Sequence, residues 1–161
     1  MKKENADVEN HSMFDIDNYF KLFSLKEKFD INKKTLYKNY IRLQQILHPD
    51  KFSSKSNVEK NLAIEYTSEV NQGYEVLSDD KKRAEYLLSL KGIIINQEEG
   101  NNIHPDPALF HEILDLSEEQ DETSIAKMKA GCIEDFKILF NQGDYESAAQ
   151  AIIKAQFLNR L

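Results

Sequence analysis

The chain has 161 residues, of which 40% are hydrophobic and 30% are charged, a composition typical of a folded globular protein with one or two small domains. Its formal net charge of -7 argues against general nucleic-acid binding. No apolar run approaches the roughly 20 residues that a membrane-spanning helix needs. A single cysteine, Cys132, excludes an internal disulfide and a cysteine-cluster metal site. We therefore expect no nucleic-acid or membrane partner, no metal and no cofactor.

The N-terminal half is predicted to be helical. Residues 1–15 carry mixed charges without an apolar stretch, so we expect a disordered lead-in rather than a signal or transit peptide. A short amphipathic segment then ends near Leu25. A long helix follows, with Asn32 as its N-cap and Pro49 as its stop. Its buried stripe recurs at helical spacing and comprises Leu36, Tyr40, Leu43 and Leu47.

A second long helix is predicted over residues 58–77, after a polar loop over 52–57. Ser78-Asp79-Asp80 breaks this helix and caps a shorter one, which ends at Gly92. The inward residues of the long helix are expected to be Ala63, Tyr66, Val70, Tyr74 and Leu77. The short helix carries Arg83, Tyr86, Leu87 and Leu90. Two long helices paired as an antiparallel hairpin, with short helices at its sides, predict a first domain over 16–92.

The C-terminal part predicts a second, smaller bundle. Residues 93–105 are the expected linker, and Asp106-Pro107 is typical of an N-cap followed by a proline at the first helical position. Three helices are then expected over 106–161, and Gly143-Asp144 supplies the C-cap of the second and the N-cap of the third. The first carries Leu109, Ile113 and Leu116. The second has an apolar stripe at near-heptad spacing, which comprises Ile125, Met128, Cys132, Phe136 and Leu139. The last places Tyr145, Ala148, Ile152 and Ala155 on one side. The predicted fold class is therefore all-α, without a sheet.

His48-Pro49-Asp50-Lys51 follows the first long helix and is the strongest candidate site. In an exposed loop, the carboxylate of Asp50 could pair with an arginine of a partner protein. Pro49 restricts the backbone and lowers the ordering cost of docking, and His48 could hydrogen-bond across the loop. Lys34, Lys38 and Arg42 recur every four residues and form one positive strip, which fits either docking or simple solubility.

A second copy of the same three letters stands at His104-Pro105-Asp106. It lacks a preceding basic helix and is followed by Pro107, so we interpret it as the start of a helix.

The first motif, together with the segment from Asn71 to Tyr86 (NQGYEVLSDDKKRAEY), resembles a J-domain. The resemblance extends to the HscB family through the opening segment Asn18 to Phe23, through HPDKF at 48–52 and through RAEYLLSLKG at 83–92. The acidic segment at 114–119 and the last residues, 157–161, are similar to that family as well. The match covers the chain from about Asp17 to its end.

Membership of this family implies a co-chaperone with two partners. The J-domain would stimulate a DnaK-class ATPase (HscA-like) through His48, Pro49 and Asp50, with Lys34, Lys38, Arg42 and Lys51 beside them. The C-terminal domain would bind an iron–sulfur cluster scaffold (IscU-like). The scaffold-binding residues that the resemblance carries over are Phe110, His111, Leu114, Asp115, Glu118, Glu122 and Phe157. His111 departs from the family, which more often has an apolar residue there.

Other function classes are weighed against this one. A J-protein of the same architecture that serves a different client is the main alternative. An enzyme is disfavoured because the sequence has no nucleophile beside a base and no glycine-rich phosphate loop. A structural helical adaptor would explain the helices but not the placed His48-Pro49-Asp50 loop. Without the paired CxxC motifs of some eukaryotic relatives, we expect a bacterial cytoplasmic protein.

Overall fold

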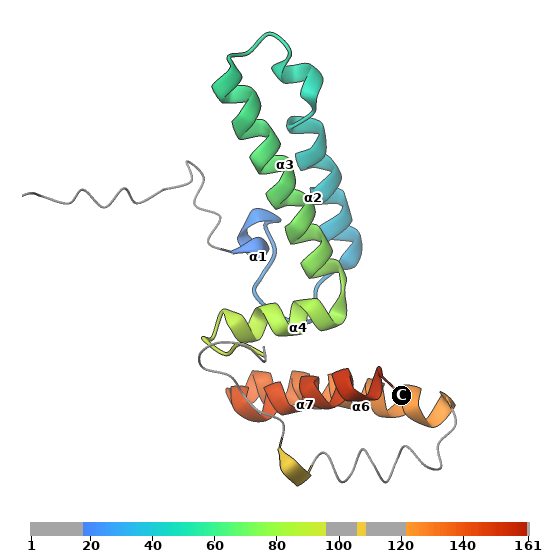
Figure 1. Ribbon diagram of the computed structural model, residues 1–161. Coiled ribbons are helices and arrows are strands. Elements are labelled where there is room, and N and C mark those ends of the chain that lie inside the picture. The colour runs from blue at the N-terminus through green and yellow to red at the C-terminus, as the bar shows by residue number, and fades with distance from the viewer. Residues whose placement is uncertain (1–17, 96–105, 109–121, 161) are drawn as a thin grey trace, which may run out of the picture.

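A computed structural model describes residues 18–95, 106–108 and 122–160 (Figure 1). The helices of these ranges confirm the predicted all-α class. In chain order they are α1 (Tyr19–Leu22), α2 (Lys33–Ile46), the 3-10 helix η1 (Pro49–Phe52), α3 (Asn57–Ser78), α4 (Asp80–Ser89), α6 (Glu122–Gln142) and α7 (Tyr145–Leu158). Within these ranges, no helix has both the length and the apolar character needed to cross a membrane.

Local signals in the sequence set the helix boundaries. The Asn32 side chain accepts a hydrogen bond from the Thr35 N–H at 3.0 Å and caps α2, as predicted. The α3 helix starts one residue earlier than predicted, because Ser56 and Glu59 form a capping box that satisfies both N-terminal donors. Asp79 caps α4 by accepting from the Lys82 N–H at 2.8 Å.

The α2 and α3 helices form the predicted antiparallel hairpin, and α1 closes one side of it (Figure 1). The Tyr40 and Tyr74 rings stack between the two helices with centroids 4.2 Å apart. Gly73 allows α1 to approach, because a Cβ atom there would lie 2.8 Å from a ring carbon of Tyr19. These contacts fix α1, α2 and α3 relative to one another, and the loop between α2 and α3 lies at the end of the hairpin far from α4 (Figure 1).

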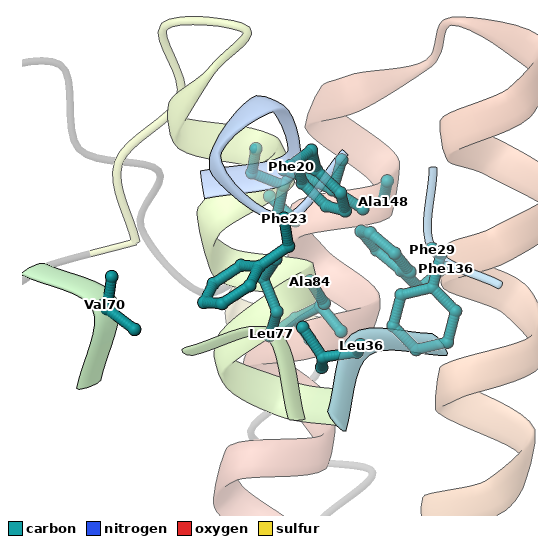
Figure 2. Close-up of a cluster of buried hydrophobic side chains, with 13 residues drawn as sticks. Phe20, Phe23, Phe29, Leu36, Val70, Leu77, Ala84, Phe136 and Ala148 are labelled. Carbon is teal, nitrogen blue, oxygen red and sulfur yellow. The ribbon is translucent and has the colours of Figure 1, made fainter. Parts of the chain in front are cut away.

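The α4 helix crosses the foot of the hairpin, and α7 packs against its other side with α6 alongside α7 (Figure 1). Buried side chains from both halves of the chain meet there in one cluster (Figure 2). Phe29 contacts Phe136 edge to face with ring centroids 5.3 Å apart. Glu85 accepts a hydrogen bond from the Gln156 amide at 2.7 Å across the same boundary. Although the sequence predicts a linker over 93–105, the two halves thus share a core; the domain boundaries themselves stay a prediction.

Candidate functional site

The loop after α2 is shaped by hydrogen bonds among its own backbone and side-chain groups. His48 has the extended conformation that a following proline favours, and Pro49 begins η1. The Asp50 N–H donates to Nδ1 of His48 at 3.3 Å, and the Lys51 N–H donates to the carbonyl of His48 at 2.9 Å. The Ser53 hydroxyl donates to the carbonyl of Asp50 at 2.9 Å. The loop therefore has a defined shape before any partner arrives, and His48 provides the hydrogen bond that the sequence suggested.

The carboxylate of Asp50 projects from this loop into solvent. Its side chain is 91% exposed, and its Oδ2 lies 3.5 Å from Nδ1 of His48. Asp50 is therefore held by its backbone while its side chain keeps the capacity to accept a bidentate arginine from another protein.

The basic strip of Lys34, Lys38 and Arg42 lies on the exposed side of α2, opposite the buried Leu36. Within the described ranges none of its three cations forms an ion pair, and the same holds for Lys51 of the loop. Lys33 differs from them, since its amine lies 2.7 Å from Asp80. The strip is therefore a positive surface whose charge no described acid neutralises, on the same hairpin as the loop.

Two apolar grooves flank the loop at the end of the hairpin. The first, here called the tip groove, has a volume of about 510 Å³, and its walls include Leu47, His48, Pro49, Phe52, Ile64 and Thr67. The second, here called the back groove, has a volume of about 380 Å³ and is lined by Leu43, Ile46, Leu62 and Tyr66, among others. Burial beside the back groove raises the pKa of the Tyr66 hydroxyl. The loop thus stands between two hollows with largely apolar walls.

Sequence reasoning found the loop and missed these grooves. Ile64 is 67% exposed and lies next to the buried stripe of α3, so it was not among the predicted inward residues. The one signal in the sequence that could have indicated the groove is Ile64, an aliphatic residue at an outward position of a helix. A groove also needs the relative placement of two helices, which helical periodicity does not provide.

The second His-Pro-Asp string behaves as a helix start where the structure describes it. The Asp106 side chain accepts a hydrogen bond from the Ala108 N–H at 2.9 Å, and Pro107 and Ala108 are helical. The predicted N-cap and N1 proline are therefore confirmed, while His104 and Pro105 lie outside the described residues.

The second candidate site falls mostly outside the described residues. Phe110, His111, Leu114, Asp115 and Glu118 all lie there. Of its two described members, Glu122 is exposed and opens α6. Phe157 is half-buried in the last turn of α7, beside Ile153 and Ile95. Because Ile125 and Met128 pack with Leu158, the start of α6 and the end of α7 lie at the same end of the helix pair. The geometry thus places Glu122 and Phe157 near one end of these two helices.

Comparison with known proteins extends these observations. Residues 18–86 match the DnaJ domain family. A co-chaperone protein HscB of Proteus mirabilis is 39% identical over 118 residues, which cover 73% of this chain and 67% of that protein. The chain belongs to the HscB family of co-chaperones.

Other HscB relatives agree with this assignment. An HscB homolog of Shewanella loihica is 46% identical over 81 residues, which span 50% of this chain but only 47% of that protein. The solved structure of the chaperone HscB from Vibrio cholerae superimposes with a TM-score of 0.74 and 29% identity, covering 89% of this chain and 92% of that one. The HscB fold therefore extends beyond the J-domain into the C-terminal helices.

Proposed function

We propose that this protein is a co-chaperone that brings an iron–sulfur cluster scaffold protein (IscU-like) to a DnaK-class chaperone (HscA-like). It stimulates the ATPase of that chaperone through the loop of His48, Pro49 and Asp50, and so supports the maturation of iron–sulfur proteins. The observation that carries the proposal is the exposed Asp50 carboxylate, held on a preshaped loop in a member of the HscB family.

The physical basis of stimulation is the pairing of Asp50 with an arginine of the ATPase. The backbone hydrogen bonds around His48 reduce the entropy lost when the loop docks. Lys34, Lys38 and Arg42 would attract an acidic face of the chaperone and raise the association rate, with a marked dependence on salt.

The scaffold is proposed to bind the C-terminal helices through Phe110, His111, Leu114, Asp115, Glu118, Glu122 and Phe157. Support comes from the family resemblance and from the position of Glu122 and Phe157 at one end of the α6–α7 pair. Holding scaffold and chaperone on one chain raises the effective concentration of one partner at the other. The alternative is a protein of the same architecture that carries a different client.

The test is the steady-state ATPase rate of the DnaK-class chaperone with this protein alone, with scaffold alone and with both. We expect stimulation by this protein, further stimulation when scaffold is added, and loss of both with Asp50→Ala. The matched control is Asp135→Ala, which removes another exposed carboxylate, on α6, and should leave the rates unchanged.

Scaffold binding is measured separately, by calorimetry with the full chain. Asp50→Ala should retain that binding, and the combined Leu114→Ala and Phe157→Ala variant should lose it while retaining basal ATPase stimulation. Stimulation that ignores the scaffold would favour the alternative client. An intact, folded protein that leaves the ATPase rate unchanged would contradict the proposal.

A further inference from the structure

The tip groove shares its wall with the loop that carries Asp50. His48 and Pro49 line the groove directly, as does Phe52 at the end of η1. The loop that carries Asp50 and the wall of the groove thus share two residues, so a partner surface that docks on this loop lies beside the groove. The back groove lacks His48 and Pro49 among its walls and opens beside Ile46 and Tyr66.

The tip groove is built to receive an apolar group. Its large aliphatic and aromatic lining residues include Leu47, Phe52 and Ile64, and Ile64 keeps 67% of its surface exposed. Covering such a residue removes apolar surface from water at about 25 cal/mol per Å². The lining also includes Lys60, so the groove favours an apolar group carried by an acidic rather than a basic surface.

We propose that the tip groove receives an aliphatic side chain of the DnaK-class chaperone, next to the arginine that pairs with Asp50; the inference rests on the function proposed above. The partner surface would combine three features: an arginine for Asp50, an aliphatic residue for the groove, and acids facing Lys60 and the basic strip. Asp50 then acts in stimulation, whereas the groove supplies affinity and selects the partner. An apolar centre beside a charged rim is the usual arrangement of such interfaces.

The experiment separates affinity from stimulation by titrating the full chain against the ATPase rate of the chaperone. Ile64→Asp should raise the concentration for half-maximal stimulation by about tenfold or more and leave the maximal rate near that of the parent protein. Ile64→Leu keeps the apolar contact and should retain near-parent affinity. Asp50→Ala should instead remove the maximal stimulation.

The matched control is Val58→Asp. Val58 lies on the same helix and is 68% exposed, about as much as Ile64 at 67%, but it lines neither groove. Its half-maximal concentration should change less than about twofold. Ile46→Asp, which places the same charge in the back groove, should also have little effect. Circular dichroism and thermal unfolding of each variant verify that the hairpin is folded.

Three results would overturn the inference: equal effects of Ile64→Asp and Val58→Asp, a larger effect from Ile46→Asp, or an Ile64→Asp variant that loses scaffold binding while its ATPase titration is unchanged. Measuring the affinity of the full chain for the ATP-bound chaperone distinguishes failure of the groove inference from failure of the proposed function. If Asp50→Ala stimulates normally but Ile64→Asp binds at least about tenfold more weakly, the role of Asp50 is wrong and the groove assignment stands.

Discussion

The two ends of the α2–α3 hairpin differ in how much of their side chains they leave in water. At the tip, the side chain of Asp50 is 91% exposed and Ile64 is 67% exposed. At the base, Arg83 is 3% exposed, and Leu87 and Leu88 are fully buried. The 22-residue α3 is about 33 Å long, and Ile64 lies about 21 Å from its C-terminal end at Ser78.

This difference separates function from stability along one pair of helices. A surface that a partner must cover cannot also be buried in the core, so the tip contributes little to the free energy of unfolding. The base joins residues of both halves of the chain and contributes much more (Figure 2). Substitutions at the base should therefore change stability, and substitutions at the tip should change binding and stimulation.

The largest effect is expected from Phe136→Ala at the base. The ring of Phe136 is fully buried and contacts Phe29 and Phe140, with centroids 5.3 and 5.4 Å away. Removing it should lower the free energy of unfolding by about 3–5 kcal/mol, measured by urea denaturation. Ile138→Ala on the same helix, where the side chain is 49% exposed, should cost less than about 1 kcal/mol. Equal losses would show that the joint, meaning the core shared by the two halves of the chain at the base, is not a major source of stability.

Arg83→Met tests the polar part of the same joint. The guanidinium of Arg83 donates to the carbonyls of Phe29 and Leu77 at 2.8 and 2.7 Å and to Asp80 at 2.7 Å. It also lies 4.5 Å from the centre of the Phe29 ring. Methionine fills the space but leaves two buried carbonyls without their donor, so we expect a loss of about 2–4 kcal/mol in urea denaturation.

Arg83→Lys is the matched control for that substitution. Lysine keeps the charge but lacks the planar fork that reaches three acceptors, so its stability should fall between those of the parent protein and Arg83→Met. A methionine variant as stable as the parent would contradict a structural role for these hydrogen bonds.

These contacts explain which parts of the fold could be predicted from the sequence. The caps at Asn32, Asp79 and Asp144 and the inward stripes of α2 and α3 depend on residues within a few positions of one another, and they were predicted correctly. The joint depends on contacts across long separations, such as the hydrogen bond from Arg83 to Phe29, 54 residues away. The sequence indicated that Arg83 lies on a short helix, and the family resemblance put Phe29 at the end of a turn, but neither could pair them.

The candidate site also has one part that the sequence predicts and one part that it does not. His48-Pro49-Asp50 is contiguous, so its position after a basic helix was visible as a motif, and the loop geometry accommodates the role suggested for His48. The tip groove joins Leu47 of one helix end to Ile64 and Thr67 of the next helix. Its existence depends on how α2 and α3 pack, which no local pattern specifies.

A pair of glycine substitutions should give smaller effects of opposite sign. Ala at Gly73 would place a Cβ atom 2.8 Å from Tyr19 and 3.1 Å from the buried Phe23. The strain should outweigh the better helix propensity and destabilise the protein by about 1–2 kcal/mol. Gly131 lies within α6 with nothing within 4 Å of such an atom, so Gly131→Ala should stabilise by about 0.5–1 kcal/mol. Thermal unfolding compares the two, and destabilisation by both would contradict the packing of α1 on α3.

The smallest effect is expected in the pH dependence of folding stability, through Asp80 at the foot of the hairpin. Partial burial alone would raise the pKa of Asp80, but hydrogen bonds from Lys33 and Arg83 outweigh it and lower the pKa below its ordinary value near 3.8. The folded state therefore binds this proton less readily than the unfolded chain does. Its contribution to stability is complete above that ordinary value and is lost as the pH falls through the lowered pKa.

Asp80→Asn tests this assignment through the pH dependence of urea denaturation between about pH 7 and pH 2. Because the Asp80 side chain is 50% exposed, solvent screening should limit the difference at neutral pH to about 1 kcal/mol or less. The variant should lose less stability than the parent protein as the pH drops below about 4. Asp50→Asn at the exposed tip is the control and should leave the acid profile as it is in the parent. If both variants instead followed the parent profile, the ion pairs of Asp80 with Lys33 and Arg83 would contribute nothing measurable, and the stability of the base would come from its apolar contacts and the backbone hydrogen bonds of Arg83.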